Sequence, residues 1–398
     1  MSAVLLGQRE HSLLELARAL LVDNASGGGK YKLLAEHGLD RFHWEGAARI
    51  YRYDVPEPSV DDFVLWGFRQ AIGGFAPETP GALRNIQLDF ASFRNDRRSS
   101  EALATLAQRA AEDLEYKRSI EDAELPELVD NDLFEVVEDR IVRLLAQAVL
   151  QRTMSAREVE EIVRARQNSI WFDGYEAAYE ALNSASQLLG ELASARFEIE
   201  SFDEGLEAYC EQWFRIDRLY RHFHRALRTT QHSELLEGLR AEVEKHYVNR
   251  YLYKLGGSWQ RQVDAAPEWR SNLLRPQGRF FTDYVEPIIR KGNRKAVVII
   301  SDALRYEVAD ELRSRIRQED RYEAEISAML GVLPSYTQLG MAALLPHKSL
   351  AHSRSGDPVL VDGQRSDGTA NRNKVLAGID GFAIQAEEVL AMSRDELR

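Results

Sequence analysis

Apolar side chains recur at helical spacing through most of the first 255 residues. Long stripes of this kind occupy 101–116, 133–150 and 174–192. The stripe in 133–150 is formed by Phe134, Val137, Ile141, Leu144, Leu145 and Ala148. Residues spaced three and four apart share one face of an α-helix, so each stripe predicts an amphipathic helix with one buried face.

The periodicity changes near residue 296. Residues 265–278, AAPEWRSNLLRPQG, combine proline, glycine and polar residues and form the best candidate boundary between helical and mixed structure. We therefore expect a helical subdomain over 1–90, a helical bundle region over 91–275 and an α/β domain over 276–398. No fixed-period repeat is found in the sequence.

The segment that follows this boundary has the pattern strand, helix, strand. Residues 296–301, AVVIIS, are a β-branched apolar run typical of a buried parallel strand, and 322–330 alternate as a second strand does. A helical face lies between them. The predicted fold is thus a mainly α-helical N-terminal region plus a C-terminal α/β domain with a partial parallel sheet.

Composition favours a cytoplasmic protein without membrane association. The 398 residues carry a net charge of −13 and a single cysteine, Cys210, which excludes an internal disulfide. No apolar run approaches the ~20 residues of a membrane span, and the N-terminus lacks the features of a signal peptide. The acidic balance argues against a general nucleic-acid surface. A local basic cluster precedes the 296–301 run and consists of Arg290, Lys291, Arg294 and Lys295.

Two oxygen-bearing side chains follow the two predicted strands. Asp302 ends the first strand, and Thr337 lies just beyond the second. Ligands of open α/β sheets bind at the carboxyl ends of the strands, so a divalent cation held by Asp302 could bind the Thr337 hydroxyl as a nucleophile. Ser335-Tyr336-Thr337-Gln338 has the form of a capping box, which assigns Ser335 to the N-cap of the next helix and leaves Thr337 free in its first turn, near backbone N–H groups suited to a phosphate.

Other interpretations of these residues stay open. Asp302 precedes a helical pattern and could be a helix N-cap with no metal. Arg305 could bind a phosphate, or it could pair with a helix carboxylate such as Glu307 or Asp310. Ser335 competes with Thr337 for the role of nucleophile.

The segments KAVVIISDALRYEVADEL and LPSYTQLGMAALLPH resemble the PglZ family, a branch of the alkaline phosphatase superfamily found in BREX phage-defence systems. Upstream helical segments such as SIWFDGYEAAYEALNSASQLL and the downstream VDGQRSDGTANRNKVLAG are similar as well. The resemblance implies that the partial parallel sheet is alkaline-phosphatase-like. It also implies a metal-dependent phosphohydrolase, acting as a phosphatase, phosphodiesterase or nuclease. Asp302 then matches a metal ligand and Thr337 matches the metal-bound nucleophile.

The resemblance also implies cofactors and partners. A complete enzyme would hold two divalent metal ions, with zinc expected, and would work with a methyltransferase and ATPases; DNA is a further candidate. Arg305, Ser335 and Arg372 are candidate substrate-binding residues. Asp362, Asp367 and Asp380 match no known downstream ligand arrangement, so the chain is expected to be partial. The alternative is a catalytically inert scaffold or docking component of the same complex.

Overall fold

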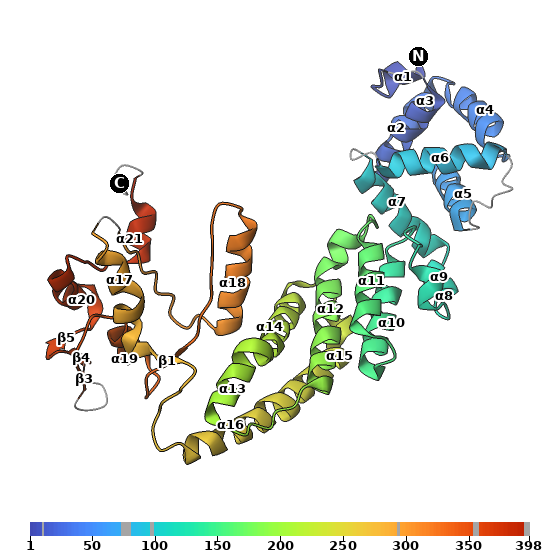
Figure 1. The fold of residues 1–398 in the computed structure, drawn as a ribbon. Coiled ribbons are helices and arrows are strands. Elements are labelled where there is room, and N and C mark those ends of the chain that lie inside the picture. The colour runs from blue at the N-terminus through green and yellow to red at the C-terminus, as the bar shows by residue number, and fades with distance from the viewer. Residues whose placement is uncertain (10–11, 73–80, 96–98, 293–294, 353–357, 394–398) are drawn as a thin grey trace. The chain divides into compact units, whose positions relative to one another are not determined.

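The computed structural model describes residues 1–398 except 10–11, 73–80, 96–98, 293–294, 353–357 and 394–398 (Figure 1). The chain divides into two compact units. The first comprises Met1–Ser194 and Leu219–Tyr247, and the second comprises Ala195–Arg218 and Val248–Arg398. The three-part division at residues 90 and 275 that we expect from the sequence stays a prediction.

The first unit is helical, as the periodicity predicts. Its helices are α1 (Ser2–Leu5), α2 (Leu13–Ala25), α3 (Lys30–Glu36), α4 (Asp40–Tyr51), α5 (Val60–Ile72), α6 (Gly81–Asn95), α7 (Ser100–Asp113), α8 (Tyr116–Ser119), α9 (Leu125–Leu128), α10 (Val136–Gln151), α11 (Ala156–Arg166), α12 (Phe172–Ser194), η2 (Ser233–Leu236), α15 (Glu237–His246) and part of α14 (Phe214–Thr229). Ser155 and Glu158 form a capping box at the start of α11. Such caps satisfy backbone N–H groups of the first turn, and they fix where a helix begins.

Helices α10 and α12 pack together along the stripes seen in the sequence. Val137, Ile141 and Leu145 of α10 are each 0% exposed. Their counterparts on α12, Ala178 and Leu182, are also fully buried. Burying such side chains is the main favourable contribution to folding, at about 1.5–3 kcal/mol for each large aliphatic residue. The prediction that these stripes face a core is confirmed.

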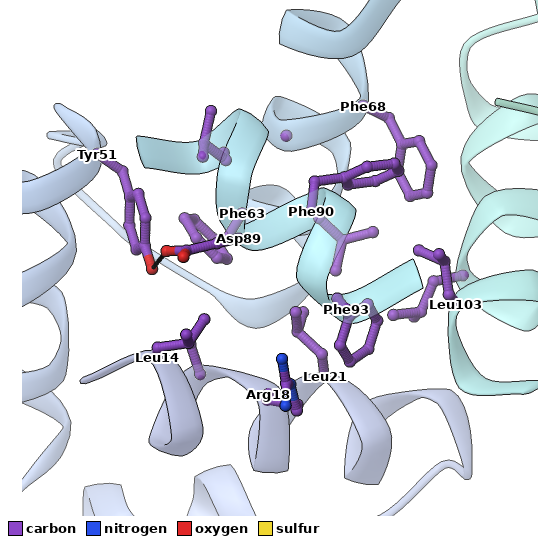
Figure 2. Close-up of a pocket in the computed structure, with 15 residues that line it drawn as sticks. Leu14, Arg18, Leu21, Tyr51, Phe63, Phe68, Asp89, Phe90, Phe93 and Leu103 are labelled. Carbon is purple, nitrogen blue, oxygen red and sulfur yellow. Dashed lines mark hydrogen bonds between the residues drawn. The ribbon is translucent and has the colours of Figure 1, made fainter. Parts of the chain in front are cut away.

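An apolar pocket lies among the first helices of this unit. It is lined by residues of α2, α4, α5, α6 and α7, including Phe63, Phe68, Phe90 and Phe93. Figure 2 shows Tyr51 and Asp89 at one side, where the tyrosine hydroxyl donates to Oδ2 of the aspartate at 2.6 Å. The lining is therefore mostly apolar, and its polar members include the Tyr51–Asp89 pair and Arg18.

The second unit carries the elements on which the site is built. They are α13 (Phe202–Ala208), η1 (Tyr209–Trp213), the remainder of α14, η3 (Tyr247–Leu252), α16 (Tyr253–Ala265), β1 (Arg275–Pro276), η4 (Gln277–Arg279), η5 (Phe281–Val285), α17 (Glu286–Ile289), α18 (Tyr306–Gln318), β2 (Met329–Leu330), α19 (Thr337–Ala343), β3 (Leu350–Ala351), β4 (Leu360–Val361), β5 (Gln364–Arg365), α20 (Gly368–Leu376), η6 (Ala377–Ile379) and α21 (Ala386–Ala391). Segments η1, η3 and η5 are π-helical. Within the described residues, short strands occur only in this C-terminal part, where they alternate with helices, as the fold class predicts.

Two small sheets form in the second unit. Strands β1 and β2 are parallel, with Arg275 opposite Met329 and Pro276 opposite Leu330. Strands β3, β4 and β5 form an antiparallel sheet in that order. The prediction of a helical N-terminal region followed by an α/β region with a small parallel sheet is confirmed.

The strand assignments within that region need correction. Residues 296–301 are not assigned to a strand, and only Met329–Leu330 of the predicted strand 322–330 is one. The parallel neighbour of β2 is β1 instead of 296–301. A strand requires a partner for its backbone hydrogen bonds, and the described residues offer none to 296–301. Val297 and Ile299 are consequently 84% and 87% exposed.

Candidate functional site

Asp302 and Thr337 come together although they lie far apart in the chain. The Thr337 hydroxyl donates to Oδ2 of Asp302 over 3.5 Å, across a separation of 35 residues. Both residues are exposed to solvent. A bond of this length is at the weak end of the hydrogen-bond range. The two oxygens therefore share a site that a ligand can reach.

Thr337 is the first residue of α19. The first bond of the helix runs from the Gly340 N–H to the Tyr336 carbonyl oxygen at 3.0 Å, which makes Tyr336 the N-cap. The assignment of Ser335 to the N-cap is wrong, because the helix begins after Tyr336. Leu339 and Ala342 bury the inner face of α19 in an apolar cluster with Leu345, Val359 and Val361. This packing leaves Thr337 in the first turn, as expected.

Asp302 lies in the loop before α18. The N-cap of that helix is Arg305, so the alternative of Asp302 as a helix cap is not observed. Ala303 has a φ of 57°, in the left-handed region that residues with a Cβ rarely adopt. The backbone therefore turns sharply immediately after the Asp302 carboxylate.

Gln277 holds both sides of the segment that carries Thr337. Its Oε1 accepts from the Val332 N–H at 3.2 Å, and its Nε2 donates to the Gly340 carbonyl oxygen at 3.1 Å. Trp269 adds a bond from its indole N–H to the Gly331 carbonyl oxygen at 2.7 Å. These three hydrogen bonds hold the segment that leads into α19 and the first turn of that helix.

Three further residues were candidates for substrate binding. Arg305 forms ion pairs with Asp217 at 3.3 Å and with Glu307 at 3.2 Å, so the expected pairing with a helix carboxylate does occur. Ser335 is exposed two residues before Thr337. Arg372 lies on α20 and donates to the Ser366 carbonyl oxygen at 3.2 Å. A role in substrate binding stays a prediction for all three.

The downstream aspartates make local contacts. Asp362 accepts from the Ser349 N–H at 2.7 Å, and this bond lowers the pKa of its carboxyl. Asp367 pairs with Arg365 at 2.8 Å, which lowers the pKa of Asp367 to about 2. In the basic cluster, Arg290 pairs with Glu286 at 2.7 Å, while Arg294 lies outside the described residues.

The Asp302–Thr337 pair fits part of a cation site. Two oxygens that ligate one zinc ion tetrahedrally, each at about 2.1 Å, lie about 3.4 Å apart. The observed separation is 3.5 Å. A carboxylate and a hydroxyl are hard oxygen ligands, which also suit magnesium and manganese. Over the described part of the chain, no group of three or more His, Cys, Asp or Glu side chains could hold a metal ion.

The sequence analysis did not identify two residues that contact this site. Asp217 and Gln277 contact the two segments that carry Asp302 and Thr337. For Asp217 a signal exists, because it lies between Trp213 and Tyr220 on a helical stripe that is otherwise apolar. Nothing in the sequence marks Gln277.

Part of this chain matches a known protein family, and most of its length is similar to two known proteins. Residues 280–398 match the family described as the BREX system PglZ alkaline phosphatase-like domain. The alkaline phosphatase-like protein BrxZ of Escherichia coli O9:H4 (strain HS) is 32% identical over 393 residues, covering 92% of this chain and 45% of that protein. The alkaline phosphatase-like protein PglZ of Bacillus cereus (strain H3081.97) is 29% identical over 404 residues, covering 97% and 47%.

The similarity to these proteins extends through both units of the chain. The chain spans about half the length of the curated relatives it matches. No solved structure shows a significant match to it. Among the helices in the described ranges, none has the length and apolar character to cross a bilayer.

Proposed function

The chain belongs to the PglZ family of BREX alkaline phosphatase-like proteins, and from this we propose that it contributes the nucleophile and a metal ligand to a phosphohydrolase of that defence system. The observation that carries the proposal is the 3.5 Å separation between Oδ2 of Asp302 and the Thr337 hydroxyl. Because the chain spans about half of its relatives, activity of the whole protein is part of the proposal.

In this proposal Asp302 and Thr337 would hold a divalent cation between their oxygens. Such an ion lowers the pKa of a bound hydroxyl and neutralises charge on a phosphoryl oxygen. The Thr337 oxygen forms a bond to phosphorus as the bond to the leaving group breaks. The hydroxyl proton would pass to water, because Oδ2 of Asp302 is the oxygen that would hold the cation. Water then hydrolyses the phosphothreonine and regenerates the threonine.

The surroundings of the pair support this chemistry. Gln277 fixes the segment before and after Thr337, and positioning a nucleophile in this way removes much of the entropic cost of reaction. Both reacting side chains are exposed, so a phosphodiester can approach them. The geometry is equally compatible with phosphatase, phosphodiesterase or nuclease activity.

The proposal also includes zinc as the metal, with two metal sites in the whole enzyme. Its partners would be a methyltransferase, ATPases and DNA. The family membership supports the defence-system context for them. The single cysteine supports action in the reducing cytoplasm.

A metal titration of the full chain tests the proposal. We expect Zn²⁺ or Mn²⁺ binding, measured by calorimetry, to weaken at least tenfold in Asp302→Ala. Thr337→Ala should weaken it less than threefold and abolish hydrolysis of bis-p-nitrophenyl phosphate. Glu387→Ala, an exposed change on α21, is the matched control. Equal affinity in wild type and Asp302→Ala, or no uptake by either, would overturn the proposal and favour the inert scaffold.

A further inference from the structure

One carboxylate oxygen of Asp217 collects donors from three separate segments. Asp217 lies on α14 and is 5% exposed. Its Oδ2 accepts from the Tyr209 hydroxyl at 2.8 Å and from the Tyr251 hydroxyl at 3.2 Å. The same oxygen lies 3.3 Å from Nη2 of Arg305. A buried carboxylate with this set of partners is firmly oriented.

The two tyrosines come from π-helical segments. Tyr209 opens η1 and Tyr251 lies in η3. The hydroxyl of Tyr251 also lies 3.4 Å from the Trp213 carbonyl oxygen, which links η3 to the end of η1. π-Helical turns are rare and occur frequently at functional sites. Here two of them deliver hydroxyls to one acceptor, and burial together with the Asp217 carboxylate raises the pKa of Tyr209.

Arg305 connects Asp217 to the loop that carries Asp302. Only Ala303 and Leu304 separate it from Asp302. Its Nη2 lies 3.3 Å from Oδ2 of Asp217, and its Nε lies 3.2 Å from Oε1 of Glu307, which is 0% exposed. Consecutive Cα atoms are about 3.8 Å apart, so a fixed Arg305 leaves Asp302 little freedom.

We infer that Asp217 is a positioning residue for the Asp302 loop: through Arg305 it holds the carboxylate of Asp302 against the Thr337 hydroxyl. The metal-binding consequence rests on the proposed function, whereas the effect on the loop does not. A purely structural role would instead be to attach α18 to α14.

Asp310 provides the matched control for that structural role. It lies on α18 and, like Asp217, is buried, at 8% exposure. Its carboxylate pairs with Arg218 of α14 at 3.3 Å and with Arg313 at 2.7 Å. Asp310 thus joins α18 to α14 through Arg218, and its second arginine partner, Arg313, lies on α18 and not in the Asp302 loop.

Limited proteolysis of the full chain distinguishes the two roles. Trypsin cleaves after arginine, so the rate of cleavage after Arg305 reports release of that side chain and its loop. We expect Asp217→Asn to accelerate this cleavage at least fivefold, relative to cleavage after Arg321. Asp310→Asn should accelerate cleavage inside α18, after Arg313 and Arg317, and change cleavage after Arg305 less than twofold.

Two further measurements keep the test decisive. Tyr209→Phe removes one hydroxyl without loss of packing and should raise cleavage after Arg305 about twofold to threefold if Asp217→Asn does not fold. Mn²⁺ titration should show at least tenfold weaker binding in Asp217→Asn and an intermediate loss in Arg305→Lys. The same cleavage pattern in Asp217→Asn and Asp310→Asn would overturn the inference. Selective cleavage after Arg305 without Mn²⁺ binding by wild type would uphold it and overturn the proposed function instead.

Discussion

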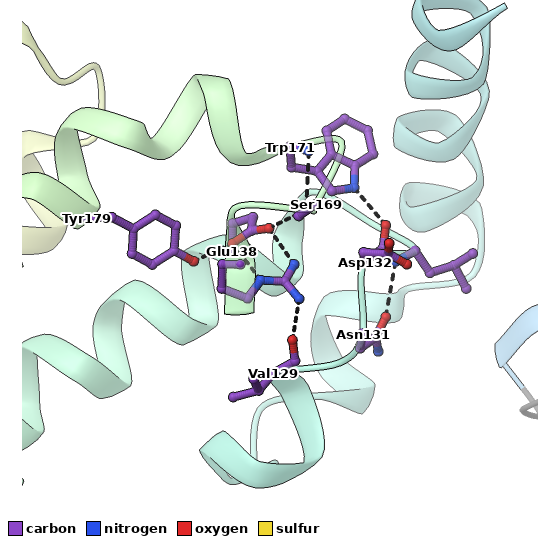
Figure 3. Close-up of polar contacts among 9 residues, drawn as sticks. Val129, Asn131, Asp132, Glu138, Ser169, Trp171 and Tyr179 are labelled. Atoms are coloured by element: carbon purple, nitrogen blue, oxygen red, sulfur yellow. Dashed lines mark hydrogen bonds and ion pairs between the residues drawn. The ribbon is translucent and has the colours of Figure 1, made fainter. Parts of the chain in front are cut away.

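The carboxylate of Glu138 and the guanidinium of Arg166 form an ion pair inside the helical bundle, with side-chain exposures of 0% and 2%. Nε and Nη2 of Arg166 both donate to the carboxylate, and Nη1 donates to the Val129 carbonyl oxygen at 2.6 Å. The hydroxyls of Ser169 and Tyr179 complete the shell around Glu138 (Figure 3). This network joins α10, α11 and α12 through polar contacts at the centre of an apolar core.

We expect Glu138→Gln to destabilise the chain by about 3–5 kcal/mol. The amide has nearly the shape of the carboxylate, but it leaves the charge of Arg166 buried without a counter-charge. Equilibrium unfolding in urea measures the change. Glu160→Gln, which removes an exposed pair with Arg164, is the control and should cost about 0.5 kcal/mol or less. Similar losses in both variants would mean that burial does not govern the strength of the Glu138 pair.

His43 gives the first unit a dependence on pH. It lies on α4, is 7% exposed, and its ring centre is 4.7 Å from that of Trp44. Burial lowers the pKa of His43 to about 4, against about 6.5 in an unfolded chain. Between these values the unfolded state binds a proton that the folded state does not. The contribution to stability is therefore present above pH 6.5 and is lost as the pH falls towards 4.

The expected loss over this interval is about 3 kcal/mol. It appears as the difference between wild type and His43→Leu when urea unfolding is followed at several pH values. In His43→Leu the free energy of unfolding should not show this loss between pH 6.5 and pH 4. Parallel pH profiles for the two proteins would contradict the prediction.

Ala303→Gly should stabilise the second unit by about 0.5–1 kcal/mol. The φ of 57° at Ala303 forces its Cβ close to the backbone, and glycine removes that strain. The same substitution inside α18, Ala309→Gly, is the control and should destabilise by about 1 kcal/mol. Thermal unfolding of the three proteins gives both signs, and a loss of stability in Ala303→Gly would show that the left-handed turn is not strained.

Gln277→Leu should destabilise the second unit by about 1–3 kcal/mol. Leucine keeps the volume but leaves the Val332 N–H and the Gly340 carbonyl oxygen without their partner. Hydrogen exchange of the Val332 and Gly340 segment should also become faster. Gln385→Leu removes an exposed bond to Thr369 and should change stability by less than about 0.5 kcal/mol. Unaltered hydrogen exchange in Gln277→Leu would show that the two Gln277 hydrogen bonds do not hold this segment.

The helices could be predicted because their information is local. The stripes in 133–150 and 174–192 specify which face is buried without knowledge of what packs on it. Residues 296–301 carry a strong strand pattern, yet a strand exists only where another segment supplies hydrogen bonds. The partner of β2 is Arg275–Pro276, a dipeptide that no β-propensity would select.

The pairing of Asp302 with Thr337 was expected from a sheet edge, and the structure brings the two together without a strand at 296–301. What determines their approach is Gln277 on one segment and the Arg305 ion pairs on the other. The Gln277 contacts and the Arg305–Asp217 pair depend on tertiary geometry, so spacing could predict only the local pair of Arg305 with Glu307. The capping argument for Ser335 failed because the first hydrogen bond of α19 runs from the Gly340 N–H to the Tyr336 carbonyl oxygen, so the helix begins one residue later than the capping box predicts.

The sharing of one Asp217 oxygen by Tyr209, Tyr251 and Arg305 also bears on how this family can diverge. Loss of the Asp217 carboxylate would remove the shared acceptor of the Tyr209 and Tyr251 hydroxyls and the Arg305 guanidinium. We therefore expect no single replacement at position 217 to be neutral. We expect homologues to change these four positions together or not at all, and covariation among them would be the evolutionary signature of the arrangement.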